Sequence, residues 1–396
     1  MKLFRTLISM EEALRTVLAY AKRTELEEIV FANALNRVLA EDVHSPVDSP
    51  PFDRAAMDGY AIRGEDSFGA SPNKAVRLRI LNKRVEIGAG ECFPIQTGMP
   101  MPKGSNAVVM LEYTKERGSD LELFRPVTPG KNVSFIGEDV KKGDVVLKEG
   151  RVLRAHDLGM LASIFKSTVR VYKRAKLGII STGDELLDPS VAGGSGIADV
   201  NSYMLAALTK KIADTRRIGI VSDDYDSIKT AISSGLDDCD GLLTTGGSSV
   251  GKRDFLADAV SDLGVIKFHG VAIRPGEPTG FGIIKDKPVF VLPGYPVAAI
   301  AAFEMLVRPF LYAMHGVKEE RAKIFAIASK KIPSAVGRTD FVRVKLICTD
   351  MECYVEPIRV SGSGILSSMT KSNGFVLIEE NKEGIEEGER VAVVAY

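Results

Sequence analysis

The pattern of apolar and polar residues divides the chain into segments of different character. Near the N-terminus, apolar residues with helical spacing follow the capping box Ser9-Met-Glu-Glu12 and predict a helix. A second helical stretch is expected over residues 24–39, ending before the proline-rich sequence HSPVDSPPFD. From about 47 to 146, short alternating runs such as AVRLRI and NAVVML are separated by Gly, Pro and Asn, which predicts a β-rich module. Residues 151–174 return to one helix and one strand.

Residues 176–316 alternate regularly between two kinds of apolar run. The strand-like runs are KLGIIS, TRRIGIVS, DGLLTT, VIKFHGVAI and VFVLPG, and helical patterns such as YDSIKTAISSGL separate them. This alternation predicts a mostly parallel, doubly wound sheet. From about residue 319 the chain is again β-like, with FVRVKLI, CYVEPIRV, GFVLIE and ERVAVVAY, and a small β-barrel is expected there.

The predicted architecture is therefore a multidomain α/β plus β protein. The N-terminal helices and the 151–174 segment flank the β module, so they are expected to form one discontinuous domain of residues 1–46 and 147–175. The β-rich domain spans 47–146, the doubly wound domain 176–317 and the C-terminal barrel 318–396. A length of 396 residues agrees with several domains.

Composition narrows the range of partners. Lys plus Arg and Asp plus Glu both number 52, which argues against nucleic acid but leaves room for a local anion pocket. The N-terminus lacks the apolar core of a signal peptide, and the run VFVLPGYPVAAIAAFEMLVRPFLYAM contains prolines and charges, which predicts a strand, a turn and a buried helix rather than a membrane span. The four scattered cysteines indicate a reducing cytoplasm, with neither a zinc site nor a disulfide framework.

Three loops are expected at the ligand-binding edge of the predicted sheet, beyond the carboxyl ends of its strands. They are STGDEL (181–186), TTGGSSVGKRD (244–254) and LPGYP (292–296). In the second loop, glycines allow close backbone approach to an anion, serines donate to phosphate oxygens and Asp254 can hold a divalent cation. The residues concerned are Gly246, Gly247, Ser248, Ser249 and Gly251. The alternative is a plain glycine-rich turn in which Asp254 caps the following helix.

Further acids and one arginine lie near the same edge. Glu185 follows the first strand of this domain and Asp223 follows the second. Taken singly, each has a structural explanation, with Asp223 as a helix N-cap and Glu185 as a first-turn charge. Together, three acidic loops on one edge favour a metal-assisted phosphate site. Arg274, in VAIRPGEPTGFG, can bind an oxyanion through two parallel N–H donors, or it is a solvated hairpin residue.

Nine segments taken together resemble the molybdopterin molybdenumtransferases, a family that includes the C-terminal part of gephyrin. The likeness covers essentially the whole chain. The segments, in order, are PPFDRAAMDGYAI, TGMPMPKGSNAVVM, GEDVKKGDVV, STGDEL, TTGGSSVGKRDF, IRPGEP, LPGYPVAA, GRTDFVRV and SGSGILSS.

The resemblance implies insertion of molybdate, or tungstate, into adenylated molybdopterin with release of AMP. It also implies a cytoplasmic homodimer, Mg²⁺ or another divalent cation held by Asp254 and Glu185, and a molybdopterin adenylyltransferase as a further partner. Nucleic acid and membrane are not expected partners. The implied catalytic residues are Asp58, Asp139, Glu185, Asp223 and Asp254. The implied substrate-binding residues outside the glycine-rich loop are Thr97, Thr182, Gly183, Pro293, Gly294 and Pro296, and the oxyanion-binding residues are Arg274, Pro278, Arg343 and Ser363.

Three departures from the family pattern concern the anion sites. The usual Lys-Pro-Gly-Lys-Pro has Arg274 and Glu277 in place of its lysines, the Asn of LPGNP is Tyr295, and the basic run before GED is replaced by residues 134–136. These changes lower the positive charge or alter the shape near the anion sites. Two other functions remain alternatives. A small adenylyltransferase shares the glycine-rich loop but lacks the MDGYA module and the barrel, and a gephyrin-like scaffold would need no catalysis.

Overall fold

A computed structural model describes residues 7–83, 86–191, 195–246, 254–319, 321–358 and 362–396. The chain forms two compact units. Unit 1 comprises Met1–Glu27, Asn36–Val38 and Tyr172–Tyr396. Unit 2 comprises Glu28–Leu35 and Leu39–Val171.

The centre of unit 1 is a six-stranded sheet in the order β16-β13-β17-β21-β20-β18. The pairs β13–β16, β13–β17 and β17–β21 are parallel, whereas β20 is antiparallel to both of its neighbours. The predicted doubly wound sheet is confirmed, and β20 is a strand that the sequence pattern did not predict. The strands are β13 (Lys176–Thr182), β16 (Asp214–Val221), β17 (Gly241–Gly246), β18 (Val265–His269), β20 (Gly280–Ile284) and β21 (Lys287–Leu292). Beside them, β14 (Leu186–Leu187) pairs with β15 (Ile197–Ala198).

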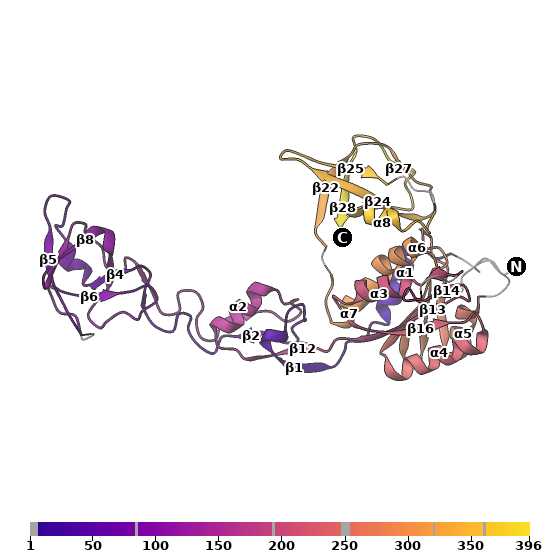
Figure 1. The fold of residues 1–396 in the computed structure, drawn as a ribbon, viewed down its shortest axis with the longest axis horizontal. Coiled ribbons are helices and arrows are strands. Elements are labelled where there is room, and N and C mark those ends of the chain that lie inside the picture. Colours follow the sequence, from indigo (N-terminus) through magenta and orange to yellow (C-terminus); the bar gives the residue numbers. More distant parts are fainter. Residues whose placement is uncertain (1–6, 84–85, 192–194, 247–253, 320, 359–361) are drawn as a thin grey trace. The chain divides into compact units, whose positions relative to one another are not determined.

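Helices cover both faces of this sheet because successive residues of each strand point to opposite sides. Ile179 of β13 packs into the core that includes side chains of α1, α3 and the helical run α6–α7, whereas Ile180 packs against α4 and α5. Figure 1 shows these two helical layers on opposite sides of the strands. The helices are α1 (Met10–Ala19), α3 (Asn201–Thr209), α4 (Tyr225–Asp238), α5 (Phe255–Leu263), α6 (Pro296–Ala302) and α7 (Arg308–Met314), with one π-helical turn, η4 (Phe303–Val307), between the last two.

The helical run Pro296–Met314 is long and apolar enough to cross a membrane by length and composition. However, 78% of its most apolar window is buried inside the protein. Phe303, Leu306 and Phe310 belong to the largest hydrophobic core. The run is therefore the buried core helix that the sequence predicts.

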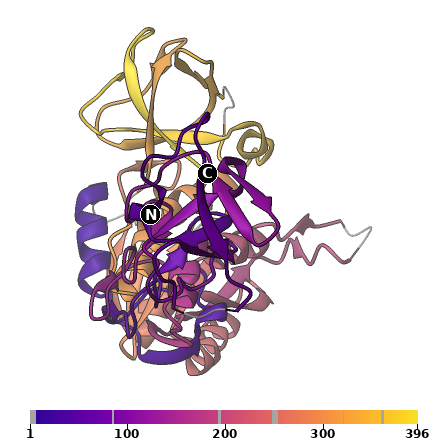
Figure 2. The same ribbon diagram turned by 90° about the vertical axis from the view of Figure 1, so that its left-hand side faces the viewer.

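The C-terminal part of unit 1 is a closed barrel, drawn in yellow and seen from two sides in Figures 1 and 2. Its strands follow the order β24-β25-β22-β28-β26, and β26 pairs back with β24. A short strand of the α/β domain, β19 (Ile273–Arg274), joins β24 in parallel. The remaining elements here are β22 (Lys323–Ala328), β23 (Ile332–Pro333), β24 (Thr339–Cys348), β25 (Cys353–Pro357), α8 (Ser367–Lys371), β26 (Gly374–Ile378), β27 (Gly384–Ile385) and β28 (Arg390–Ala395).

Unit 2 contains a second six-stranded sheet, in the order β7-β4-β6-β5-β9-β8. Its strands are β4 (Gly59–Ile62), β5 (Val76–Ile80), β6 (Glu91–Ile95), β7 (Ala107–Met110), β8 (Thr114–Arg117) and β9 (Asp120–Leu123). A separate core surrounds α2 (Ala155–Ser163) and includes Leu39, Leu153 and Leu161. The shorter elements are β2 (Val43–His44), β3 (Arg54–Ala55), η2 (Gly64–Ser67), η3 (Leu111–Tyr113), β10 (Val133–Ser134), β11 (Val145–Leu147) and β12 (Thr168–Tyr172).

The helix expected over residues 24–39 is wrong. The structure has β1 (Leu26–Val30) and the short 3₁₀ turn η1 (Phe31–Asn33) in its place. β1 pairs with β12, whose β-branched sequence TVRVY favours a strand. The partner strand lies more than a hundred residues away in sequence, so local helical spacing was a poor guide to this segment.

The cysteine prediction is also wrong for one pair, because Cys348 and Cys353 form a disulfide. These residues lie directly opposite each other on the antiparallel strands β24 and β25. Cys92 and Cys239 are free and buried. The disulfide therefore closes the β24–β25 hairpin of the barrel.

Replacing both Cys348 and Cys353 by alanine should lower the free energy of unfolding by about 2 kcal/mol, because a short closed loop removes only a modest amount of unfolded-state entropy. Calorimetry with and without a dithiol reductant measures this change. The reductant should lower the melting temperature of the native sequence and leave that of the double variant unchanged. Equal melting temperatures of the two proteins without reductant would show that the crosslink does not stabilise the barrel.

Candidate active site

The site begins where the chain order of the central sheet reverses. In the sheet, β13 lies between β16 and β17, which are the next two strands of this sheet along the chain. Such a switch point opens a crevice at the carboxyl ends of the strands. Thr182 at the end of β13 lies beside Gly246 at the end of β17. Gly246 has φ of +107°, and a side chain there would lie 2.1 Å from the Thr182 carbonyl oxygen. Glycine is required at this position because the two strand ends approach so closely.

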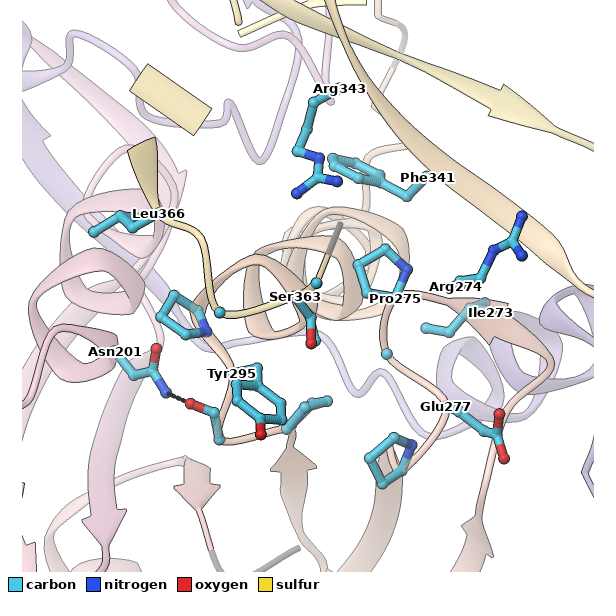
Figure 3. Close-up of a pocket in the computed structure, with 18 of the residues that line it drawn as sticks. Asn201, Ile273, Arg274, Pro275, Glu277, Tyr295, Phe341, Arg343, Ser363 and Leu366 are labelled. Atoms are coloured by element: carbon cyan, nitrogen blue, oxygen red, sulfur yellow. Dashed lines mark hydrogen bonds between the residues drawn. The ribbon is translucent and has the colours of Figure 1, made fainter. Parts of the chain in front are cut away.

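A pocket of about 1400 Å³ lies between this sheet edge and the barrel. Figure 3 shows side chains from both sides converging on it. Ten of the predicted site residues line it, namely Thr182, Glu185, Gly246, Arg274, Pro278, Pro293, Gly294, Pro296, Arg343 and Ser363. These residues run from Thr182 to Ser363 along the sequence and are brought together in unit 1.

The pairing of β19 with β24 places Arg274 directly beside Asp340. The guanidinium donates to both carboxylate oxygens, with Nε 2.8 Å from Oδ1. Asp340 is buried and also accepts a hydrogen bond from the Ser334 hydroxyl, at 2.7 Å. The positive charge of Arg274 is therefore largely balanced within the protein.

Arg343 presents a different electrostatic environment. Its guanidinium is half-buried, and desolvation lowers the pKa of Arg343. One nitrogen, Nη1, donates to the Ser368 hydroxyl at 2.9 Å, while the buried Nε has no hydrogen-bond partner in the described part of the chain. In Figure 3 the guanidinium points into the pocket, towards the side that carries Ser363. Of the two predicted oxyanion-binding arginines, Arg343 is the one without a carboxylate partner among the described residues.

Glu277 lines the pocket and forms an ion pair with Arg338, with the nearest nitrogen and oxygen 3.3 Å apart. Sequence analysis missed Arg338, although it lies within the motif GRTDFVRV. The Glu277 carboxylate therefore neutralises the Arg338 guanidinium, which would otherwise be available to an anionic ligand.

Glu277→Lys should tighten the binding of molybdate and tungstate by about tenfold or more, because it removes a repulsive charge, releases Arg338 and adds a donor. Calorimetric titration of each oxyanion into the native protein and the variant measures the change. The gain should shrink at high salt because both side chains are partly exposed. Glu277→Gln is the matched control for charge removal alone. Equal or weaker binding by Glu277→Lys would place residue 277 outside the anion site.

A group of carboxylates lies beside the pocket. Partial burial, followed by the nearby charges of Glu185 and Asp184, raises the pKa of Asp223. The helix cap of α4 is Asp224, which accepts from the Ser227 amide, so the capping role considered for Asp223 is wrong. Glu185 lies in a turn before β14 rather than in a first helical turn, so that alternative is wrong as well. No cluster of three or more His, Cys, Asp or Glu side chains suited to a metal occurs among the described residues.

Asp254 is engaged by two neighbours. One carboxylate oxygen accepts from the Ala257 amide at 3.1 Å and caps α5, which is the structural role considered for this residue. The other oxygen lies 3.2 Å from Nε2 of His269, at the end of β18. The cap does not exclude a second role, because each carboxylate oxygen has more than one lone pair. The predicted phosphate-binding residues Gly247, Ser248, Ser249 and Gly251 lie outside the described residues.

The other predicted residues belong to different parts of the structure. Gly183 has φ of +151°, and an added side chain would lie 2.7 Å from a Glu185 oxygen. In unit 2, Asp58 accepts from both the amide and the hydroxyl of Thr97, each at 2.7 Å, and these bonds lower the pKa of Asp58. Asp139 is exposed, and its amide donates to the Ser49 carbonyl.

Asn201 is a pocket residue that sequence reasoning missed. It is buried at the start of α3, and its amide group donates to the Thr245 hydroxyl at 2.8 Å and to the Gly294 carbonyl at 2.7 Å. It therefore ties two of the three edge loops together. A polar residue at the start of a predicted helix gave only a weak indication, because such residues usually serve as caps.

Three family models match consecutive parts of the chain. They are the MoeA N-terminal region (domain I and II) over residues 8–165, the probable molybdopterin binding domain over 178–313, and the MoeA C-terminal region (domain IV) over 326–396. The pocket of unit 1 is lined by residues of the second and third matches.

Whole-chain relatives agree with these models. A molybdopterin biosynthesis protein of Methanocaldococcus jannaschii is 45% identical, covering 99% of each chain, and a molybdopterin molybdenumtransferase of Haemophilus influenzae is 33% identical, covering 94% of each. The crystal structure of the molybdopterin biosynthesis moeA protein from Pyrococcus horikoshii OT3 has a TM-score of 0.85 and 37% identity, covering 99% of this chain and 100% of that one. The chain therefore belongs to the molybdopterin molybdenumtransferase family.

Proposed function

We propose that the pocket of unit 1 binds adenylated molybdopterin together with molybdate or tungstate, and that the reaction releases AMP as the metal enters the dithiolene. One observation carries this assignment. The pocket joins the glycine-constrained strand ends at Thr182 and Gly246, suited to phosphate, to a half-buried guanidinium, Arg343, that has no carboxylate partner in the described part of the chain. Phosphate and oxyanion thus meet in one cavity.

The arginine, the strand ends and the carboxyl groups of the pocket have different proposed roles. Arg343, which lines the same pocket as Ser363, attracts the oxyanion by a charge-assisted hydrogen bond. Gly183 and Gly246 leave the strand ends without side chains, so that a phosphate can approach the backbone there closely. Partial burial and the charges of Glu185 and Asp184 raise the pKa of Asp223, so this edge carries negative charge that a bound cation would neutralise.

We propose that a divalent cation, Mg²⁺ in the first instance, binds with the substrate phosphates as its main ligands, since the described residues supply only isolated carboxylates. Glu185 and Asp223 are oxygen ligands close enough to affect each other's charge, and Mg²⁺ is commonly held by one or two carboxylates plus substrate phosphates. Glu185 and Asp254 are the proposed protein ligands. When bound, the cation supplies neutralisation of negative charge on the phosphoanhydride.

The proposed assembly is a cytoplasmic homodimer whose cleft is lined by both subunits, with Asp58, Thr97 and Asp139 facing the cleft from one copy and Asp254 from the other. Mixing inactive Asp58→Ala and Asp254→Ala proteins tests this arrangement. Mixed dimers would contain one intact site, so about a quarter of native activity should return after subunit exchange. No recovery, with exchange verified by mass spectrometry, would mean that each site lies within one subunit.

The reaction itself is tested by incubating the purified protein with adenylated molybdopterin and each oxyanion, and by measuring AMP and cofactor formation. Release of pyrophosphate from ATP and molybdopterin would instead support an adenylyltransferase. Absence of turnover with either substrate would favour a scaffold role. In the pathway as proposed, a separate adenylyltransferase supplies the adenylated substrate.

A further inference from the structure

Tyr295 is an aromatic side chain left largely exposed inside the pocket. Its relative exposure is 65%, and it lies at the N-cap of α6, directly after Pro293 and Gly294. The backbone there is extended, and Pro296 begins the helix, so the ring projects from the carboxyl edge of the sheet. Figure 3 shows it on the α/β side of the cavity, with Arg343 and Phe341 on the barrel side.

Among the residues that the structure describes, few contacts hold this ring in place. No side-chain hydrogen bond, ion pair or ring contact of Tyr295 occurs among the described residues. A Cβ placed at Gly364 would lie 3.3 and 3.5 Å from two carbons of the ring. The barrel segment at Gly364 therefore approaches the ring without a side chain. An unburied aromatic ring in a cavity retains most of the apolar surface that a flat ligand can cover.

We propose that Tyr295 is a stacking platform for a planar bicyclic heteroaromatic ring of the substrate, either the adenine or the pterin. This inference rests on the proposed function, which supplies a ligand that carries both rings. Offset stacking is the preferred contact between a tyrosine ring and such a bicycle. Arg343, on the opposite wall, is available to an anionic group of the same ligand or of the bound oxyanion.

Two probe ligands show whether Tyr295 stacks on the adenine or on the pterin. AMP binding is measured by calorimetry, and binding of 6-hydroxymethylpterin is measured by quenching of pterin fluorescence, which no tryptophan obscures because the chain has none. Tyr295→Leu should weaken the binding of one probe by about 5- to 150-fold, the range that stacked bases lose on removal of an aromatic side chain. Tyr295→Phe keeps the ring and should bind within about twofold of the native protein.

Tyr203→Leu is the matched control. Tyr203 is 43% exposed in the same domain, but its ring lies under Arg217, whose guanidinium carbon is 3.5 Å from the ring centroid, and it does not line the pocket. This control should bind both probes normally. Native affinity of Tyr295→Leu for both probes overturns the proposal, as does a change in its oligomeric state at unchanged affinity, which would make the ring an interface residue.

The test of stacking on Tyr295 can fail or succeed independently of the test of the proposed reaction. If the native protein stacks AMP through Tyr295 but forms no cofactor, the platform stands and the reaction assignment fails. If the native protein forms cofactor and Tyr295→Leu binds both probes normally, the reaction stands and the platform is overturned.

Discussion

Asp254→Asn should lower turnover on the order of 100- to 1000-fold, the usual loss when one charge-stabilising group is removed from an active site. The asparagine keeps an oxygen that can accept from the Ala257 amide, so the cap of α5 is preserved while the negative charge is lost. Single-turnover AMP release measures the effect on chemistry. Titration of Mn²⁺, followed by electron paramagnetic resonance, measures the effect on the cation.

The capping role of Asp254 requires its own control. Asp224 caps α4 in the same way, through the Ser227 amide at 2.9 Å, and has no proposed chemical role. Asp254→Ala and Asp224→Ala should each cost about 1 kcal/mol of stability. Only the change at position 254 should abolish AMP release. Native turnover and Mn²⁺ binding in Asp254→Asn would reduce this residue to a helix cap.

Arg343→Met should weaken molybdate and tungstate binding by about 10- to 150-fold, because hydrogen bonds to charged groups contribute roughly 1.5–3 kcal/mol. The variant should fold at least as well as the native protein, since a half-buried guanidinium whose Nε has no partner in the described structure carries a desolvation cost. Calorimetric titration of each oxyanion and thermal unfolding measure the two effects. If Arg343→Met impairs only the binding of molybdate, a higher molybdate concentration should restore the cofactor yield of the variant.

Arg390→Met is the control for net charge. Arg390 lies on the same barrel, with its guanidinium over the ring of Phe325, and it does not line the pocket. Its loss should leave oxyanion affinity unchanged within about twofold at moderate salt, where distant charges are screened. Equal weakening in both variants would show that the barrel attracts oxyanions by its general charge and that Arg343 forms no specific site.

Hydrophobic periodicity identified the parallel strands and the helices of the α/β domain because these elements have distinct local periods, whereas the short antiparallel strand β20 was missed. Strands such as KLGIIS and DGLLTT were identified correctly, and their order along the chain implied parallel pairing. Parallel pairing in turn placed Thr182, Gly246 and Pro293 at one edge, where the pocket lies. The run after Pro296 was identified as a buried helix because its prolines and charges interrupt an otherwise apolar segment.

The sequence by itself thus determined the parallel core of the sheet, the barrel and the family, and it predicted ten of the residues that line the pocket. Only the tertiary structure decided which charges neutralise one another there. Arg274 meets Asp340 because β19 joins the barrel, Glu277 meets Arg338 across 61 residues, and Arg343 retains no carboxylate partner within the described residues. The same holds for the strand β1 and the Cys348–Cys353 crosslink. Local periodicity reports which way a side chain faces, whereas charge pairing, strand partners and crosslinks depend on distances that exist only after the chain has folded.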